Sequence, residues 1–353
     1  MSKSLNPAED LLGMTLRNDW KVIEKITSPS HSTGGNFSIC YKVEKEGKIA
    51  FLKALDLSRA FAHKDFLKLL EILVTAHNYE CDLLKICSQK RMSRVVSILD
   101  DGEIPADPSN GKQIPVNYLI FEMADKSARD HIALAHRMDN AWIMRSLHHV
   151  AVGLNQLHKN GIVHQDLKPS NVLLFENATS SKIADLGRAE MKTSRSIYFN
   201  QEIAGDPSYS PPELLYHQVL PDWNIRRQAC DLFHLGSLLT FYYTKSQMTS
   251  LIQSYLPSPY HWQNWSGDYK LVLPYLEESF EVIMLDMKKT IFASVKDDAL
   301  AKEVVSIVQR LCNPDPEKRG HTSNFNLGVT KYSLERYISW FIKLARIFEA
   351  KVI

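Results

Sequence analysis

Three kinds of polar side chain occur together in the middle of the chain. One short stretch contains the carboxylate of Asp166, the amine of Lys168 and the amide of Asn171. A second carboxylate, Asp185, follows a predicted hairpin. Phosphoryl transfer needs a group that accepts a hydroxyl proton, ligands for a metal ion that bridges phosphates, and a cation that neutralises charge. Carboxylate and amide oxygens are what hard Mg²⁺ prefers. These four side chains offer all three.

The two segments form the patterns H-x-D-x-K-x-x-N, at 164–171, and D-x-G, at 185–187. A single loop carboxylate among 40 acidic residues is more often solvated than catalytic. The joint order and spacing of both patterns favour chemistry instead. Together they resemble the catalytic segment of the eukaryotic-type, or Hanks-type, serine/threonine protein kinases. The motifs are the variants HQD and DLG, a non-RD form in which Gln165 stands where many members have arginine.

The resemblance assigns a role to each of these residues. It implies that Asp166 is the catalytic base and that Lys168 contacts the γ-phosphate of ATP. It implies that Asn171 and Asp185 hold Mg²⁺ or Mn²⁺. Lys168 within D-L-K-P-S-N is typical of the serine/threonine kinases, so the expected acceptor is a Ser or Thr hydroxyl of a protein substrate.

A lysine and a glutamate that precede the catalytic segment resemble the family's ion pair, whose lysine holds the α- and β-phosphates. Lys53 lies on a predicted strand, KIAFLKAL, and Glu80 lies on the long helical stretch that follows. Glu71 lies on the same stretch and is the alternative partner. Glu80 is preferred because its distance from the next apolar run, 95–99, matches the family.

The phosphate-covering loop is the weakest part of the resemblance. The family has G-x-G-x-x-G, whereas residues 33–38 keep only the middle glycine and the aromatic residue at the tip. Fewer backbone N–H groups can then approach the phosphates, which predicts weaker nucleotide affinity. On the adenine side, Cys40 replaces a valine and Phe51 replaces an alanine. The residues expected to bind ATP are Gly34, Gly35, Asn36, Phe37, Cys40, Phe51, Lys53, Glu122 and Ala124.

Three positions further along resemble residues that hold the family's active site together. Glu213 ends a segment similar to the A-P-E motif and is expected to pair with Arg319, in a motif similar to D-P-x-x-R. Asp231 resembles the helix aspartate that binds the catalytic-loop backbone. The resemblance covers residues 14–325 approximately, with its strongest motifs at the catalytic centre.

Control of the enzyme is expected to depart from the usual pattern. Gln165 carries no charge, so a phosphate opposite it would lose the charge-assisted hydrogen bonds that an arginine provides. Phosphorylation of the loop 188–210 is therefore not expected to switch the enzyme on. Asp206, which replaces the usual threonine, is expected to place a fixed negative charge or a hydrogen-bond acceptor near Lys168. The alternative is that Arg188 or another base takes over from the missing arginine.

The predicted helices and strands agree with the places of these residues in the kinase fold. Short strands are predicted at 20–26, 39–47, 48–55 and 116–123, with a turn at Glu46-Gly47. A helix or a pair of helices is predicted between 61 and 89. Apolar residues at steps of four and three predict a helix from 141 to 160, and nearly all the chain beyond 213 reads as helical.

The expected fold class is α+β, a bilobal protein-kinase-like fold with a β-rich N-lobe containing one main helix and a larger helical C-lobe. The expected divisions are an N-terminal extension at 1–13, the N-lobe at 14–123, the C-lobe at 124–325, and a C-terminal helical extension at 326–353 packed on the C-lobe.

The composition limits the classes of partner that can be expected. The 42 basic and 40 acidic residues nearly balance, so neither nucleic acid nor a membrane is expected as a partner. The N-terminal residues do not form a secretion signal, and the predicted location is cytoplasmic. The sequence does not specify the oligomeric state. The five cysteines lack metal-ligand spacing and are expected to be reduced; they are Cys40, Cys81, Cys87, Cys230 and Cys312.

Two other functions fit parts of the sequence. A pseudokinase, which would use the fold as a scaffold, is suggested by the degenerate glycine loop, but it would not need the full set of Lys53, Glu80, Asp166, Asn171 and Asp185. A small-molecule phosphotransferase has a related catalytic loop. It would not be expected to combine Lys168 with the Glu213 and Arg319 motifs.

Overall fold

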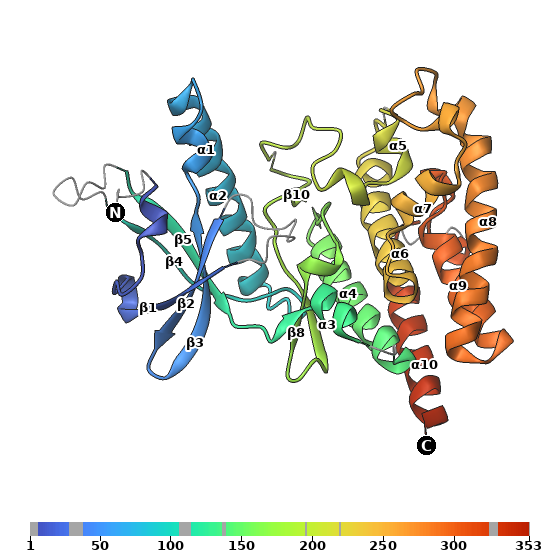
Figure 1. Cartoon of the computed structure of the whole chain (residues 1–353), viewed down its shortest axis with the longest axis horizontal. Coiled ribbons are helices and arrows are strands. Elements are labelled where there is room, and N and C mark those ends of the chain that lie inside the picture. The colour runs from blue at the N-terminus through green and yellow to red at the C-terminus, as the bar shows by residue number, and fades with distance from the viewer. Residues whose placement is uncertain are drawn as a thin grey trace. The chain divides into compact units, whose positions relative to one another are not determined.

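The chain divides into two compact units, Met1–Ala124 and Asp125–Ile353. The computed structural model describes residues 6–27, 38–105, 114–135, 139–194, 196–218, 220–324 and 331–352. The first unit is built around a sheet and the second mainly from helices, as the elements in Figure 1 show. This combination of a β-rich unit and a larger helical unit is the predicted fold class.

The first unit contains a five-stranded antiparallel sheet in the order β1-β2-β3-β5-β4. Glu46 and Gly47 both have positive φ, as a tight two-residue hairpin between β2 and β3 requires. Because successive side chains alternate between faces, one face of these strands is buried in the core. The strands are β1 (Lys21–Ile26), β2 (Ser38–Lys45), β3 (Lys48–Leu55), β4 (Ile98–Ile104) and β5 (Val116–Glu122).

Two helices, α1 (Ser58–Phe61) and α2 (Phe66–Gln89), follow β3. The side chain of Asp65 accepts a hydrogen bond from the backbone of Lys68 and so caps the start of α2. The helical stretch is thus a pair of helices, one of the two predicted forms. The described residues that precede β1 also pack on this unit, because Ala8 is fully buried and its carbonyl accepts a hydrogen bond from the Tyr41 hydroxyl, at 2.7 Å.

In the second unit, helix α4 (Asn140–Lys159) carries the predicted apolar stripe, all of it fully buried. Each such Ile, Leu or Val contributes roughly 1.5–3 kcal/mol relative to an exposed position. Gly161 has a φ of +68°, which ends the helix as its sequence predicts. The neighbouring short elements are β6 (Lys126–Ser127), α3 (Ala128–Leu134), β7 (Ile162–Val163), β8 (Val172–Phe175), β9 (Ser180–Ile183) and β10 (Glu190–Met191).

Most of the described residues beyond Pro212 are helical. Helix α6 is buried on almost every side, which explains its long apolar sequence. Among the described residues, no helix is both long and apolar enough to span a membrane. The helices are α5 (Pro212–Leu215), α6 (Ala229–Thr244), α7 (Met248–Tyr255), α8 (Tyr269–Val295), α9 (Asp298–Leu311) and α10 (Glu335–Val352).

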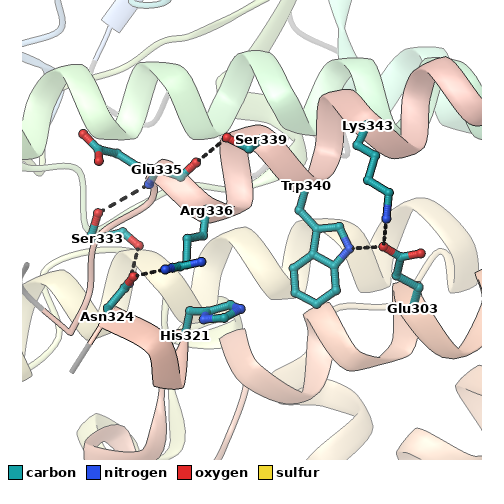
Figure 2. Close-up of a pocket in the computed structure, with 9 residues that line it drawn as sticks. All are labelled: Glu303, His321, Asn324, Ser333, Glu335, Arg336, Ser339, Trp340 and Lys343. Atoms are coloured by element: carbon teal, nitrogen blue, oxygen red, sulfur yellow. Dashed lines mark hydrogen bonds and ion pairs between the residues drawn. The ribbon is translucent and has the colours of Figure 1, made fainter. Parts of the chain in front are cut away.

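The last helix, α10, packs on α4 through its apolar face. On its other side, Trp340 and Lys343 of α10 both donate hydrogen bonds to Glu303 of α9, at 2.6 and 2.9 Å. These residues line an open pocket of about 530 Å³ (Figure 2). None of the predicted site residues lines this pocket.

Candidate active site

The backbone of the predicted catalytic loop is held by one buried carboxylate. Asp231 of α6 accepts hydrogen bonds from the backbone N–H groups of His164 and Gln165, both at 2.8 Å. Gln165 has a φ of +63°, a left-handed conformation that needs such support. Burial alone would raise the pKa of Asp231, but hydrogen bonds from His158 and the backbone of Gln165 hold it below its usual value. Asp231 therefore occupies the position that the resemblance implies.

The carboxylate of Asp166 lies at the centre of a polar cluster. Its Oδ2 is 3.1 Å from the Lys168 amine and accepts a hydrogen bond from the Asn171 amide at 3.3 Å. Its Oδ1 accepts a hydrogen bond from the backbone N–H of Asp206 at 2.8 Å. The side chain of Asn171 also binds the Asp166 carbonyl, at 2.8 Å. The structure thus brings together three of the residues that the sequence singles out.

The segment 205–206 approaches this cluster closely. A Cβ atom on Gly205 would lie 2.5 Å from the carbonyl oxygen of Gln165 and 2.8 Å from a carboxylate oxygen of Asp166, so glycine is required there. The carboxylate of Asp206 is 3.6 Å from the amine of Lys168. The predicted negative charge near Lys168 is therefore present in the structure.

The carboxylates of Asp166 and Asp206 differ in the direction of their pKa shifts. Burial raises the pKa of Asp166, and the nearby charge of Asp185 adds to the rise while Lys168 opposes it. For Asp206, burial acts in the same direction, but hydrogen bonds from Ser208 and the charge of Lys168 hold its pKa below the usual value. Lys168 thus lies between two acidic groups with opposite pKa shifts.

The β8–β9 hairpin positions Asp185, as predicted from its sequence. Val172 pairs with Ile183, and the Ala184 N–H donates to the Asn171 carbonyl at 2.9 Å, so the end of β9 lies beside the start of β8. Asp185 follows with a φ of +64° and an exposed side chain. The charge of Asp185 helps to raise the pKa of Asp166.

In the first unit, the amine of Lys53 lies 3.0 and 3.2 Å from the two carboxylate oxygens of Glu80. Glu80 is buried on α2, whereas Glu71 is exposed on the same helix. The geometry therefore selects Glu80 over Glu71 as the partner. Cys40 lies directly opposite Lys53 in the β2–β3 pairing.

The structure describes some of the remaining residues that are predicted to bind ATP. Phe51 lies on β3, opposite Lys42 on β2. Glu122 ends β5, and its side chain accepts a hydrogen bond from the Ser97 backbone at 2.7 Å, while Ala124 is the last residue of the first unit. The glycine-loop residues Gly34, Gly35, Asn36 and Phe37 lie outside the described residues.

The pair of Glu213 and Arg319 is also present. Two guanidinium nitrogens of Arg319 lie 2.5 and 2.6 Å from the two carboxylate oxygens of Glu213, and neither side chain is exposed. This bidentate geometry is the strong form of an ion pair. Removing one partner from such a buried pair typically costs about 3–5 kcal/mol, so the pair is a structural element.

Beside the catalytic loop lies a buried cluster that was not predicted from the sequence. It consists of Gln165, Glu190, Trp223 and Arg227, and we call it the Arg227 cluster. Arg227 lies in the π-helical turn η6 (Asn224–Gln228), and one of its nitrogens is 2.9 Å from Glu190. Both side chains are fully buried. Arg227 also donates to the side-chain oxygen of Gln165, and Trp223 donates to Glu190 at 3.0 Å. The only signal in the sequence was a double arginine shortly before Asp231.

The Arg227 cluster also holds part of the loop 188–210. Arg227 donates to the carbonyl of Phe199 at 3.0 Å, and Gln165 donates to the carbonyl of Arg188 at 3.2 Å. The guanidinium of Arg188 itself lies over the ring of Tyr198, 4.3 Å from its centroid. The base that interacts with Gln165 is therefore Arg227, and Arg188 contributes its backbone.

Known proteins similar to this chain include several kinases. The calcium/calmodulin-dependent protein kinase kinase cmkC of Emericella nidulans is 31% identical over 150 residues, which are 40% of this chain and 26% of that protein. The serine/threonine-protein kinase GIN4 of Saccharomyces cerevisiae is 25% identical over 205 residues, 57% of this chain and 15% of that protein. The chain thus spans about a quarter or less of the length of these relatives.

The family comparison covers most of the chain. A model described as the protein kinase domain matches residues 33–326. The match includes most of each unit and all the residues described above as candidates for chemistry. The chain therefore belongs to the protein kinase domain family.

Proposed function

We propose that this protein kinase transfers the γ-phosphoryl group of ATP to serine or threonine hydroxyls of other proteins. The observation that best supports the proposal is the environment of the Asp166 carboxylate. Its Oδ1 accepts one hydrogen bond, from the Asp206 N–H, among the described residues. A carboxylate oxygen has about two acceptor positions, so Oδ1 retains one for a substrate hydroxyl.

The proposed reaction uses Asp166 as the proton acceptor. The hydroxyl oxygen of the substrate bonds to the γ-phosphorus, the bond from that phosphorus to the bridging oxygen breaks, and ADP leaves. The hydroxyl proton passes to Asp166. Lys168, with its amine 3.1 Å from Asp166, neutralises charge on the transferred group. Lys53, oriented by Glu80, binds the α- and β-phosphates.

Asn171 and Asp185 are the residues that would hold Mg²⁺ or Mn²⁺. The amide nitrogen of Asn171 is directed at Asp166, which leaves its oxygen, in a long 3.5 Å contact with Ser170, as the available ligand atom. The described residues contain no cluster of three His, Cys, Asp or Glu side chains that could hold a metal alone. The remaining ligands would be phosphate oxygens and water, which Mg²⁺ commonly keeps. The metal would neutralise charge on the phosphates.

A transfer assay with the purified full chain tests the proposal. The chain is incubated with γ-labelled ATP and Mg²⁺ or Mn²⁺, with a mixture of protein substrates, and the labelled proteins are hydrolysed to identify the phosphorylated amino acid. We expect phosphoserine and phosphothreonine, and no label when the metal is chelated. An absence of ATP consumption with either metal would indicate the pseudokinase, and label confined to a small-molecule acceptor would indicate the other phosphotransferase.

Cys40 offers an independent test of the proposed nucleotide site. It is partly exposed, whereas the other four cysteines are buried. Residues directly opposite each other on antiparallel strands share a face, so Cys40 lies on the same side of the sheet as Lys53. We expect Mg-ATP to slow alkylation of Cys40, measured by peptide mapping, and inorganic triphosphate at the same concentration to protect it less. Equal labelling with and without Mg-ATP would contradict the adenine assignment.

A further inference from the structure

Helix α8 has an apolar stripe on its exposed face. Leu271 and Leu285 are each 62% exposed, and three other large apolar side chains on the helix are 38–46% exposed. The stripe consists of Leu271, Tyr275, Val282, Leu285 and Phe292, with Glu278 and Lys289 in the two intervening positions. Successive positions are separated by four and three residues in turn, which is the heptad spacing of a helix that packs against another helix.

The packing of α8 within its own chain relies mainly on the other side of the helix. The opposite side of the helix supplies the buried residues, among them Val272, Leu276 and Ile283, and packs against α7 and α9. In Figure 1, α8 (orange) lies beside α9 on the outside of the second unit. Contiguous exposed apolar surface of this kind commonly marks an interaction site.

The part of the stripe from Tyr275 to Phe292 lies on uninterrupted helix. Pro274, which lacks a backbone N–H, precedes it. At 1.5 Å per residue the segment is about 27 Å long, enough for several layers of side chains. The ring of Tyr275 stacks on Tyr260, with ring centroids 3.8 Å apart, which fixes one end of the stripe while leaving Tyr275 38% exposed.

The charges within the stripe indicate its partner. We propose that the exposed face of α8 binds the same face of a second copy of this chain, with the two helices antiparallel. In that arrangement, with the two-fold axis between residues 283 and 284, Val282 lies opposite Leu285 of the second copy and Tyr275 lies opposite Phe292. Glu278 then lies opposite Lys289, so the two charged positions of the stripe meet with opposite signs.

A parallel pairing is disfavoured by the same residues. It would place Glu278 against Glu278 and Lys289 against Lys289, and like charges in contact are destabilising. The flanking charges agree with the antiparallel arrangement, because Glu281 lies near Lys288 of the second copy. Lys288 and Lys289 already pair with Asp298 and Asp286 of their own chain, at 3.3 and 2.8 Å. Their amines have further donors, since Lys289 is 79% exposed and Lys288 is 38% exposed.

Sedimentation velocity over a range of concentrations tests whether the chain self-associates through this face. We expect the wild-type chain to form a dimer and Leu285→Glu to weaken the association at least about 100-fold, because each dimer would bury two carboxylates in place of two leucines. Leu134→Glu is the matched control, since Leu134 is 73% exposed on α3 and lies outside the stripe. It should associate like the wild type.

Charge reversal tests the antiparallel register. Glu278→Lys and Lys289→Glu should each weaken self-association. An equimolar mixture of the two variants should associate, because each Glu–Lys position is complementary again in the mixed dimer. The double variant should also dimerise. A wild-type chain that stays monomeric at all concentrations, or that dimerises equally well with Leu285→Glu, would overturn the proposal. If each single variant self-associates as strongly as the wild type, the antiparallel arrangement is wrong.

Discussion

Replacing Asp166 with alanine is expected to lower the rate of phosphoryl transfer about 10²–10⁴-fold, the usual effect of losing a positioned acid–base group. The Lys168 and Asn171 side chains and the Asp206 backbone all bind this carboxylate. Asp166→Asn should lose nearly as much activity, since an amide keeps the shape of the side chain but accepts a proton poorly. The loss should appear in kcat rather than in the KM for ATP, because Asp166 is assigned to the proton and not to the nucleotide.

The control for this experiment is Asp82→Ala, which removes an exposed carboxylate from α2. It should leave the rate within a factor of two of the wild type, because isolated surface substitutions rarely change stability by more than about 0.5 kcal/mol. Thermal unfolding of each variant checks that the chain remains folded. Full activity in folded Asp166→Ala would rule out the proposed catalytic role.

The parts of the site that could be predicted from sequence are those fixed by short spacings. Asp166, Lys168 and Asn171 lie within six residues of one another, so the loop that connects them determines their contacts. Lys53 could be placed because the β2–β3 hairpin is marked by Glu46-Gly47, and its pairing with Glu80 depended on the helix that follows. The choice of Glu80 over Glu71 agrees with the structure because only Glu80 is on the buried side of α2.

The parts that could not be predicted depend on contacts between distant residues. Glu190 and Arg227 are separated by 37 residues, and no local pattern links a strand residue to a later π-helical turn. A charged residue in a sequence is normally expected at the surface, so both appeared to be solvated side chains. The apolar stripe of α8 was hidden for the opposite reason, since apolar residues on a helix suggest the core until their exposure is known.

The position of Arg227 has a consequence for control of the enzyme. In kinases that use an arginine before the catalytic aspartate, a loop phosphate supplies the opposite charge. Here Gln165 instead accepts a hydrogen bond from Arg227, whose charge is balanced by Glu190. The same guanidinium binds the carbonyl of Phe199. We infer that this buried acid and base take the part that a loop phosphate plays in those kinases.

From this we expect that the enzyme needs no loop phosphate for activity. After phosphatase treatment, with mass spectrometry confirming an unmodified loop, its initial rate on a protein substrate should equal that of the untreated enzyme. A requirement for a phosphate would appear as a lag in the treated enzyme that pre-incubation with ATP abolishes. In a variant with one loop Ser→Ala or Thr→Ala substitution, pre-incubation would then no longer abolish the lag.

Arg227→Met should remove this built-in support. It leaves Glu190 buried without its cation, which typically costs about 3–5 kcal/mol, a large part of the ~5–15 kcal/mol that stabilises a domain. Limited proteolysis should then cut the loop 188–210 sooner, and the initial rate should fall. Arg226→Met is the matched control. It removes a half-buried guanidinium that lies over the Phe199 ring, 5.3 Å from its centroid, a contact worth about 0.5–2 kcal/mol, so it should change the rate and the cleavage of the loop less than Arg227→Met does.

If Arg227→Met fails to fold, the double variant Glu190→Gln, Arg227→Met separates stability from control. Removing both charges avoids the uncompensated carboxylate, so the fold should recover. The carbonyl of Phe199 and the side chain of Gln165 would still lack their donor, so the loop should remain sensitive to protease and the rate should stay low. A folded double variant with wild-type activity would show that the Arg227 cluster stabilises the second unit without holding the loop in its active arrangement.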